Sequence, residues 1–290
     1  MNIASLAILG PGLLGGSLAI DLSLASFPDL RIWARRPEVL DQARARGIGG
    51  LLTNSLAEAV DGADLVVLAT PVGAMPALAA QLAVLANPPR IVTDMGSVKG
   101  MVELHVAPLL RNAGMAFVGA HPMCGSEQKG LSAARAGLFT NAMCLLTPQP
   151  QEDPEVLATV RAFWLSLGCR VAELTPTSHD EAVARVSHLP HAAAALLAAT
   201  AVGGKPDLLA YSAGGFRDST RVADGPPDMW TEILLENRKA LSPLLHMMAR
   251  QLTELAEALD VEDATKIHAL LEAGRAARSP LPVVSSSAMV

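Results

Sequence analysis

The sequence has few aromatic side chains and few cysteines. Phenylalanine, tryptophan and tyrosine together make up 3% of the 290 residues, so the core must be built from aliphatic side chains, chiefly Ala and Leu. The three cysteines, Cys124, Cys144 and Cys169, form no CxxC pair and leave an odd count. This pattern favours a reducing compartment, and we therefore expect a cytoplasmic protein.

Positive charge is also scarce. Lysine and arginine number 22 against 28 aspartates and glutamates, which gives a formal net charge of −6 at pH 7. Binding to a phosphate backbone requires a basic face, so the composition argues against a nucleic-acid partner. An anionic small molecule would have to be held by local cationic groups that work against the overall field.

Long apolar runs are missing as well. The nearest candidate, LPHAAAALLAATAV at residues 189–202, contains a proline and falls short of the ~20 residues that a membrane-spanning helix needs. We interpret it as a buried helix and expect no membrane association. The N-terminal MNIASLAILG has no cationic start and runs directly into a glycine motif, which is typical of a first strand and not of an export signal.

What is present, up to about residue 175, is an alternation of short apolar runs with segments of helical spacing. Strand followed by helix, repeated, predicts an α/β fold with a doubly wound parallel sheet covered by helices on both faces. From there to about residue 274 we find only helical periodicity, broken by a glycine-rich loop. The predicted strands are IASLAILG, LRIWA, DLVVLAT, RIVTDMG, MAFVGA, AMCLLTP and CRVAELT.

A glycine motif follows the first predicted strand. Gly10, Gly12 and Gly15 in ILGPGLLGGSLA have the spacing G-x-G-x-x-G between a strand and a helix. The first glycine permits a tight turn, the second lets the backbone approach a pyrophosphate, and the third lets the helix pack on the strand. In this context the motif predicts a Rossmann-type dinucleotide site. We expect the same site to include Leu13, Leu14, Thr70 and Ser97.

The end of the second predicted strand bears on the choice of cofactor. An NAD site places Asp or Glu about 20 residues beyond the glycines, whereas an NADP site replaces the acid and adds arginine for the 2′-phosphate. Here Ala34 stands where the acid is expected, followed by Arg35 and Arg36. We predict NADP as the cofactor, with NAD as the alternative if the two arginines form only a solvated face.

The alternation stops at the proline-containing TPTS, residues 175–178. We predict a dinucleotide-binding domain over residues 1–176 and a helical substrate and dimerisation domain over residues 177–290, ending in a loose tail, RSPLPVVSSSAMV. Ser178 is expected to cap the first long helix, with Glu181 completing a capping box. Helices this apolar leave more apolar surface than one small bundle can bury, which predicts a homodimer.

Two segments place polar side chains where strands end. DMGSVKG, residues 94–100, follows the strand RIVT, so Ser97 lies at the carboxyl edge of the sheet, where open α/β folds bind ligands. Ser97 could hydrogen-bond a nicotinamide or a substrate hydroxyl, or could instead cap a helix that begins near Val98. GAHPMCGSEQKG places His121 between a strand end and a glycine-rich turn, and Pro122 excludes a helical conformation for it. We therefore expect His121 to lie in a loop. A surface histidine without a function is the alternative interpretation.

Two further motifs lie in the helical half. SHLPH places His188 and His191 three apart on one helix face. Two histidines at this spacing can chelate a metal, but no third ligand stands at a recognisable spacing, and His191 before a run of alanines reads as a core residue. GGFRDSTR supplies Arg217 and Arg221, whose planar guanidinium groups match a substrate carboxylate; the alternative is a charged surface loop.

Taken in order, GPGLLGGS, DMGSVKG, HPMCGSEQKG, SHLPH and GGFRDSTR resemble the prephenate and arogenate dehydrogenases of tyrosine biosynthesis. The resemblance covers roughly residues 3 to 240. It implies NAD(P)-dependent oxidative decarboxylation of a cyclohexadienol, prephenate or arogenate, by a Rossmann domain joined to a helical dimerisation domain. We expect no tyrosine-sensing regulatory domain beyond residue 290.

The resemblance also implies roles for individual residues. His121 matches the active-site histidine that takes the proton of the ring hydroxyl, and an imidazole with a pKa near ~6.5 suits that role. Ser97 matches a serine that bridges the substrate hydroxyl, the histidine and the nicotinamide. The remaining correspondences are His188 on the substrate side, Arg221 for a substrate carboxylate with Arg217 as the alternative, and Glu127 as a residue that lines or gates the pocket.

Two alternatives remain open. A 3-hydroxy-acid dehydrogenase of the 6-phosphogluconate type also joins a Rossmann half to a helical half, but it would carry a lysine on the long helix, and SHLPHAAAALL has none. A catalytically silent nucleotide-sensing module would form no phenol from either substrate.

Overall fold

The computed structural model describes residues 3–125 and 128–279. The chain divides into two compact units, Met1–Leu241 and Ser242–Val290. The first unit contains a sheet and the helices that follow it, and the second is entirely helical in its described part.

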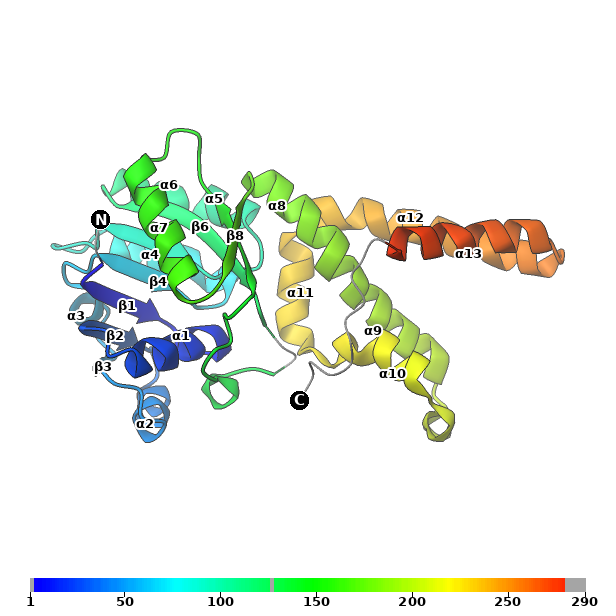
Figure 1. Ribbon diagram of the computed structural model, residues 1–290, viewed down its shortest axis with the longest axis horizontal. Helices are drawn as coiled ribbons and strands as arrows, with labels where there is room; N and C mark the ends of the chain where they lie inside the picture. The colour runs from blue at the N-terminus through cyan, green and yellow to red at the C-terminus, as the bar shows by residue number, and fades with distance from the viewer. Residues whose placement is uncertain (1–2, 126–127, 280–290) are drawn as a thin grey trace. The chain divides into compact units, whose positions relative to one another are not determined.

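The first unit is built on one eight-stranded sheet with the order β3-β2-β1-β4-β5-β6-β7-β8 (Figure 1). Strands β1 to β6 run parallel, β7 pairs with β6 in the antiparallel sense, and β8 is parallel to β7. The carboxyl ends of the first six strands therefore share one edge. The strands are β1 Ser5–Leu9, β2 Asp29–Trp33, β3 Leu51–Thr53, β4 Leu65–Leu68, β5 Ile91–Asp94, β6 Ala116–Met123, β7 Met143–Thr147 and β8 Arg170–Glu173.

Helices cover both faces of this sheet. One apolar cluster joins the sheet to α1, through Leu18, and to α7, through Trp164, while the other joins it to α4 and α6, through Leu78 and Leu110. The central strands are buried on both faces, which explains why they are continuous apolar runs and not alternating ones. The helices are α1 Leu13–Leu24, α2 Pro37–Ala45, α3 Leu56–Val60, α4 Met75–Leu82, α5 Gly100–His105, α6 Ala107–Asn112 and α7 Pro154–Ser166.

The predicted fold class is confirmed, with two differences in the sheet. All seven predicted strands form, but β3 was missed because its three residues are too short for a visible pattern. The reversal of β7 relative to β6 makes the sheet mixed at that edge. Apolar runs report burial and carry no information about strand direction, so the sequence predicted a parallel sheet throughout.

The helical segment of the first unit begins after β8. Helix α8, Pro176–Val183, passes through a π-helical turn, η3 Ala184–His188, into α9, Leu189–Val202. Pro190 lacks the backbone donor that a regular helix needs at that position, which accounts for the irregular turn before it. The following elements are η4 Pro206–Tyr211, α10 Gly214–Thr220, η5 Arg221–Asp224 and α11 Pro227–Glu236.

Two local predictions in this segment were wrong. Thr175, not Ser178, caps α8: its hydroxyl oxygen accepts the Ser178 N–H at 3.1 Å. Pro176 takes the first helical position, which is where proline is favoured, so the helix starts earlier than the capping-box pattern indicated. GGFRDST forms helix α10 and not a loop, since both glycines accept helical geometry.

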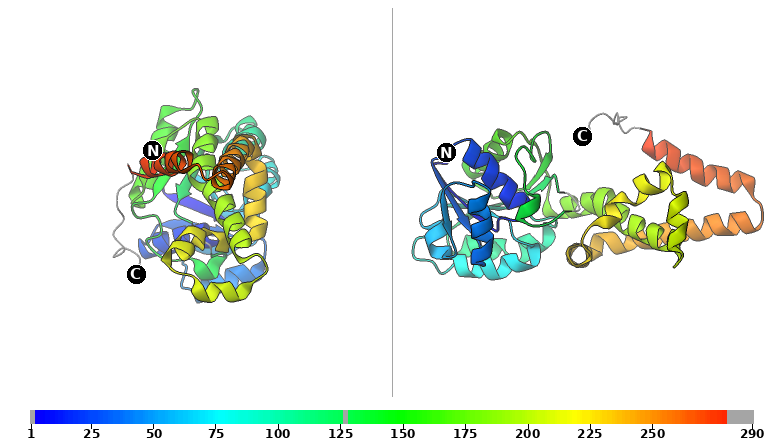
Figure 2. Two further views of the ribbon diagram at one scale, coloured as in Figure 1. Left: turned by 90° about the vertical axis from the view of Figure 1, so that its right-hand side faces the viewer. Right: turned by 90° about the horizontal axis from the view of Figure 1, so that it is seen from below.

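The second unit contains most of α12, Arg238–Asp260, and all of α13, Ala264–Arg278 (Figure 2). Asp263 caps α13 by accepting the Lys266 N–H at 3.0 Å. Leu252, Leu259 and Leu271 are each more than half exposed. The two units divide within α12, and the boundary at residues 176/177 stays a prediction. Within residues 3–125 and 128–279, no helix is long and apolar enough to cross a membrane.

Candidate active site

The glycine turn after β1 has the geometry of a dinucleotide site. Gly10 adopts φ +101°, and a side chain there would lie 2.9 Å from Thr70 Cγ2. A Cβ on Gly15 would stand 2.3 Å from the Gly10 carbonyl oxygen, so helix and turn pack without space between them. A Cβ on Gly12 would meet nothing within 4 Å, which leaves the backbone open to a ligand.

Unpaired polar groups surround this opening. Leu13 and Leu14 form the first turn of α1, where backbone N–H groups have no partner inside the helix. Thr70 Oγ1, beyond the end of β4, is buried with no hydrogen-bond partner in the described part of the chain. A pyrophosphate and its attached ribose would supply acceptors for these donors, so the residues present fit a nicotinamide dinucleotide.

The arginine pair lies beside the end of β2. Ala34 is buried next to the strand end, whereas Arg35 and Arg36 are exposed, and α2 starts at Pro37. Among the described residues neither arginine forms an ion pair. The two guanidinium groups are therefore available to an anionic ligand.

His121 lies within β6, opposite Leu145 of β7. The predicted loop position was wrong, since the strand continues through Pro122 to Met123. Proline tolerates extended geometry, and antiparallel pairing with β7 prolongs the strand beyond its parallel contact with β5. The side chain is partly buried at the carboxyl edge of the sheet, the edge that also carries the glycine turn.

A buried ion pair fixes the backbone next to His121. Lys99 forms an ion pair with Asp94, at the end of β5, and its Nζ donates to the Ala120 carbonyl oxygen at 2.8 Å. Asp94 in turn accepts the Ala120 N–H at 3.0 Å and the Gly96 N–H at 2.8 Å. Both charged side chains are at most 1% exposed. The residue that precedes His121 is thus held through both of its backbone polar groups.

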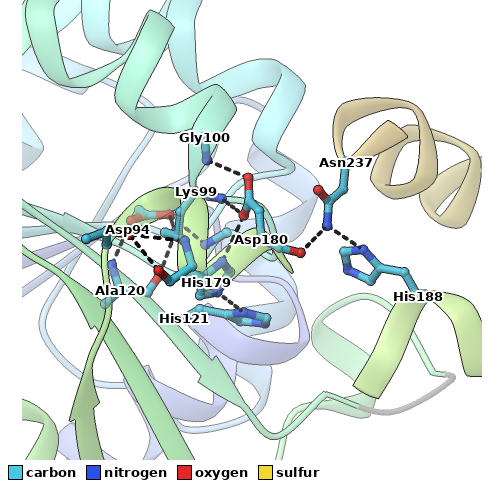
Figure 3. A network of polar contacts seen from close by, with 12 residues as sticks. Asp94, Lys99, Gly100, Ala120, His121, His179, Asp180, His188 and Asn237 are labelled. Carbon is cyan, nitrogen blue, oxygen red and sulfur yellow. Dashed lines mark hydrogen bonds and ion pairs between the residues drawn. The ribbon is translucent and has the colours of Figure 1, made fainter. Parts of the chain in front are cut away.

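A second group of contacts reaches His121 from α8 (Figure 3). The His121 Nδ1 atom lies 2.9 Å from His179 Nε2, and the His179 Nδ1 atom lies 2.8 Å from Asp180 Oδ1. The Asp180 carboxylate also accepts the N–H groups of Lys99 at 2.7 Å and Gly100 at 2.8 Å. Helix α8 is therefore joined to both β6 and the start of α5.

Burial and charge keep the histidines of the site neutral. Burial holds the pKa of His121 well below 6.5, and the unfavourable charge interactions of a protonated ring with His179, Lys99 and His188 act in the same direction. Burial also lowers the pKa of His179, against the opposing effect of the Asp180 hydrogen bond. Burial lowers the pKa of His188 to about 4. At neutral pH each imidazole therefore has one protonated and one free nitrogen.

His188 lies in the π-helical turn and is 1% exposed. Its Nδ1 atom is 3.0 Å from Asn237 Nδ2, and the same amide nitrogen donates to the Asp180 carbonyl oxygen at 2.8 Å. Since an amide nitrogen only donates, His188 accepts at Nδ1 and carries its proton on Nε2. His191 stacks on Trp230 with ring centroids 3.5 Å apart, and it is buried as the sequence indicated.

The other predicted residues are less constrained. Ser97 is partly buried in the bend between β5 and α5, and it does not cap α5, whose N-cap is Lys99. Arg217 in α10 and Arg221 at the start of η5 are exposed. Glu127 lies outside the described residues. In residues 3–125 and 128–279, no group of His, Cys, Asp or Glu side chains could hold a metal ion.

Sequence reasoning missed five residues of the site: Asp94, Lys99, His179, Asp180 and Asn237. Asp94 and Lys99 lie in the segment DMGSVKG, in which we considered only Ser97. The presence of an acidic and a basic residue directly after a buried strand could have indicated them. His179 and Asp180 were assigned only to a helix. Their contact with His121 joins residues 58 positions apart, and no periodicity reports such a contact.

Comparison with known proteins agrees with this architecture. Residues 32–173 match the family model described as prephenate dehydrogenase, nucleotide-binding domain, and residues 175–273 match the one described as prephenate dehydrogenase, dimerization domain. The chain is 36% identical to cyclohexadienyl dehydrogenase of Zymomonas mobilis over 264 residues, which is 89% of each chain.

Two solved structures are similar over nearly their whole length. Prephenate dehydrogenase from A. aeolicus, in complex with hydroxyphenyl propionate and NAD+, gives a TM-score of 0.83 at 30% identity and covers 96% of this chain and 98% of its own. Synechocystis arogenate dehydrogenase gives 0.78 at 30% identity, covering 95% and 99%. With both family models matched in order along one chain, and with a nicotinamide-compatible glycine turn at its start, the protein belongs to the prephenate dehydrogenase family and is an NAD(P)-dependent prephenate/arogenate dehydrogenase.

Proposed function

We propose that the protein oxidises prephenate with NADP and that His121 is the base of the reaction. The observation that carries this proposal is the position of His121 at the same sheet edge as the glycine turn. The carboxyl ends of β1, β4, β5 and β6 meet there, and ligands of open α/β sheets bind at that edge.

The chemistry requires a base at the ring hydroxyl. A nicotinamide held at the glycine turn would supply the acceptor for the hydride of the carbinol carbon. His121 takes the hydroxyl proton at Nε2 as the hydride leaves, because a neutral imidazole accepts a proton at neutral pH. The ring carboxylate is then lost as carbon dioxide, its bonding electrons complete the aromatic ring, and the oxygen takes back a proton as a phenol.

Other side chains orient the substrate. His188 carries its proton on Nε2, so it can donate a hydrogen bond to a substrate oxygen. Ser97 follows β5, adjacent to the strand of His121, and its hydroxyl can contact both the ring hydroxyl and the nicotinamide. Arg221 is exposed and unpaired within the described residues, and we assign it to a substrate carboxylate, with Arg217 as the alternative. Glu127 remains a proposed pocket residue.

Prephenate and arogenate differ only in a keto or an amino group on the side chain, and the named relatives include enzymes of both kinds. The deciding experiment measures kcat/KM for each substrate with NADP and with NAD, using purified protein. We expect phenol formation with prephenate, at a rate equal to or above that with arogenate. Strict use of arogenate would overturn the substrate assignment, and no phenol from either substrate would overturn the role of His121 together with it.

We also infer a homodimer in the cytoplasm. The match to a dimerization domain and the exposed leucines of the second unit support self-association. Cys124, Cys144 and Cys169 are all unpaired, and burial raises the pKa of each thiol, which keeps them unreactive in a reducing compartment.

A further inference from the structure

The contacts from Asp180 through His179 to His121 form a chain whose hydrogens can be assigned. Asp180 Oδ1 accepts the Lys99 N–H and Oδ2 accepts the Gly100 N–H. A carboxyl oxygen that accepts a backbone hydrogen offers only a further lone pair to another partner. The 2.8 Å contact between Asp180 Oδ1 and His179 Nδ1 is therefore a hydrogen bond in which His179 donates.

The next link follows from this assignment. A neutral His179 that carries its proton on Nδ1 has a lone pair on Nε2. The 2.9 Å contact between His179 Nε2 and His121 Nδ1 then requires His121 to donate. His121 is left with its proton on Nδ1 and a free lone pair on Nε2, which is the form that a base needs.

We propose that His179 and Asp180 are positioning residues that fix the tautomer and ring orientation of His121. This inference rests on the proposed role of His121 as the base. The opposite tautomer would point the His179 Nδ1 lone pair at a carboxylate oxygen and would direct an N–H of His121 at the substrate hydroxyl. His121 in that form could not take the proton.

The pair also stabilises the charge that forms during the reaction. When Nε2 of His121 takes the hydroxyl proton, the ring becomes cationic and its Nδ1–H bond to His179 strengthens. Asp180 supplies a negative charge at the far end of the chain. This charge is fixed in place, because Lys99 N, Gly100 N and the Asn237 amide hold both the carboxylate and the backbone of Asp180.

Asp180→Asn tests the assignment with little change in shape. The Asp180 carboxylate accepts from three donors, whereas the amide of Asn has one acceptor oxygen and one donor nitrogen. In one of its two orientations the amide turns its NH₂ group toward His179 Nδ1, which reverses the direction of the hydrogen bonds from residue 180 to His121. In Ser–His–Asp hydrolases the same change lowers kcat about 10⁴-fold through the wrong tautomer. We expect kcat to fall at least ~10²-fold, with the Kd for NADP within two-fold of the unmodified value.

Two substitutions of His179 separate the hydrogen bond from simple packing. The amide oxygen of His179→Gln can still accept the His121 Nδ1–H, whereas His179→Leu offers no acceptor. We expect the Gln variant to retain at least ten-fold more kcat than the Leu variant, with both variants folded by circular dichroism and equal in NADP binding. Equal kcat in the two variants would overturn the proposal.

Nitrogen NMR of protein labelled with ¹⁵N-histidine reads the tautomer without turnover. In the unmodified protein we expect a protonated Nδ1 and an unprotonated Nε2 for His121, assigned by comparison with His121→Asn. A protonated Nε2 at neutral pH would refute the inference. If His121→Asn keeps normal kcat, the role of His121 as base fails; if it loses kcat while the His179 and Asp180 variants do not, only the positioning role fails.

Discussion

His121 depends on residues from two separate parts of the chain. Asp94 and Lys99 hold the backbone before it, His179 contacts its ring, and burial holds its pKa well below 6.5. The imidazole is consequently neutral throughout the neutral pH range. The protonation state of His121 is therefore set by burial and by its neighbours and not by the ordinary pKa of an imidazole.

Replacing His121 by Asn should remove the base and leave the dinucleotide site intact, because the side chain lies outside the glycine turn. General base catalysis is typically worth 10²–10⁴ in rate, so we expect kcat to fall by about 10²-fold or more. Steady-state kinetics and NADP titration measure the two effects. Turnover within a factor of three of the unmodified enzyme would exclude His121 as the base.

Arg221→Ala should act through substrate binding. Loss of one charge-assisted hydrogen bond costs about 1.5–3 kcal/mol, which corresponds to a rise in KM of ~10-fold or more. Arg217→Ala is the matched control, since both arginines are exposed and four residues apart. An effect on KM in the control and none in Arg221→Ala would move carboxylate binding to Arg217.

Arg35→Ala should reduce the preference for NADP. Each charge-assisted bond to a 2′-phosphate contributes roughly 1.5–3 kcal/mol, so we expect kcat/KM with NADP to fall about ten-fold while the value with NAD stays within two-fold. Arg44→Ala, in the same helix region but already paired with Asp41, is the control. Better use of NAD than NADP by the unmodified enzyme would show that Arg35 and Arg36 only face solvent.

At the scale of helices and strands, α11 meets the sheet part of the first unit through carboxylates. Glu232 accepts the Gly73 N–H at 2.6 Å, and Glu236 Oε2 is buried without a partner among the described residues. Burial, then Glu232 and Asp180, raise the pKa of the Glu236 carboxyl to about 7. Helix α11 therefore carries a carboxyl that stays protonated at mildly acidic pH.

The raised pKa of Glu236 makes stability depend on pH. Because the folded state holds this proton more tightly than the unfolded state, its contribution is complete below about pH 4.5 and is lost as the pH rises through 7. Relative to the unmodified protein, Glu236→Gln should gain about 1–2 kcal/mol in unfolding free energy between pH 5 and pH 8, after allowance for solvent screening.

Urea denaturation of both proteins at the two pH values measures the difference. Glu254→Gln, which removes an exposed glutamate of α12, should show no such pH-dependent change. A Glu236→Gln difference that is the same at pH 5 and pH 8 would contradict the prediction.

Some helices, strands and turns could be predicted from the sequence, and others could not. Apolar runs predicted seven strands because burial on both faces leaves a continuous pattern. The glycine spacing predicted the turn because a side chain would clash at Gly10 and at Gly15. The three residues of β3, the reversal of β7 and the π-helical turn before Pro190 leave no such pattern. His121 was found by its proline and glycine context, whereas its partners His179 and Asp180 depend on tertiary contact.

At the scale of the whole molecule, the second unit has apolar side chains that the described residues leave exposed. Leu252 and Leu259, seven residues apart on α12, are 57% and 58% exposed. We expect light scattering at micromolar concentration to give twice the chain mass of 30.1 kDa. Leu252→Glu combined with Leu259→Glu should shift that mass toward the monomer, whereas Leu24→Glu, on a leucine of α1 that is more exposed than either, should not.

A monomeric mass for the unmodified protein would refute self-association. A dimer that both leucine substitutions leave unchanged would place the contact on another surface of the chain.

The buried pair of Asp94 and Lys99 constrains how this sequence can change over generations. Removing one member leaves an uncompensated charge in the interior, which typically costs 3–5 kcal/mol, a large part of the 5–15 kcal/mol that holds a domain folded. Replacing both by apolar residues of similar volume removes the uncompensated charge, but it leaves the N–H groups of Gly96 and Ala120 and the Ala120 carbonyl without these partners. We therefore expect the two positions to change together, because each single substitution leaves a buried charge and a double substitution leaves only neutral groups unpaired.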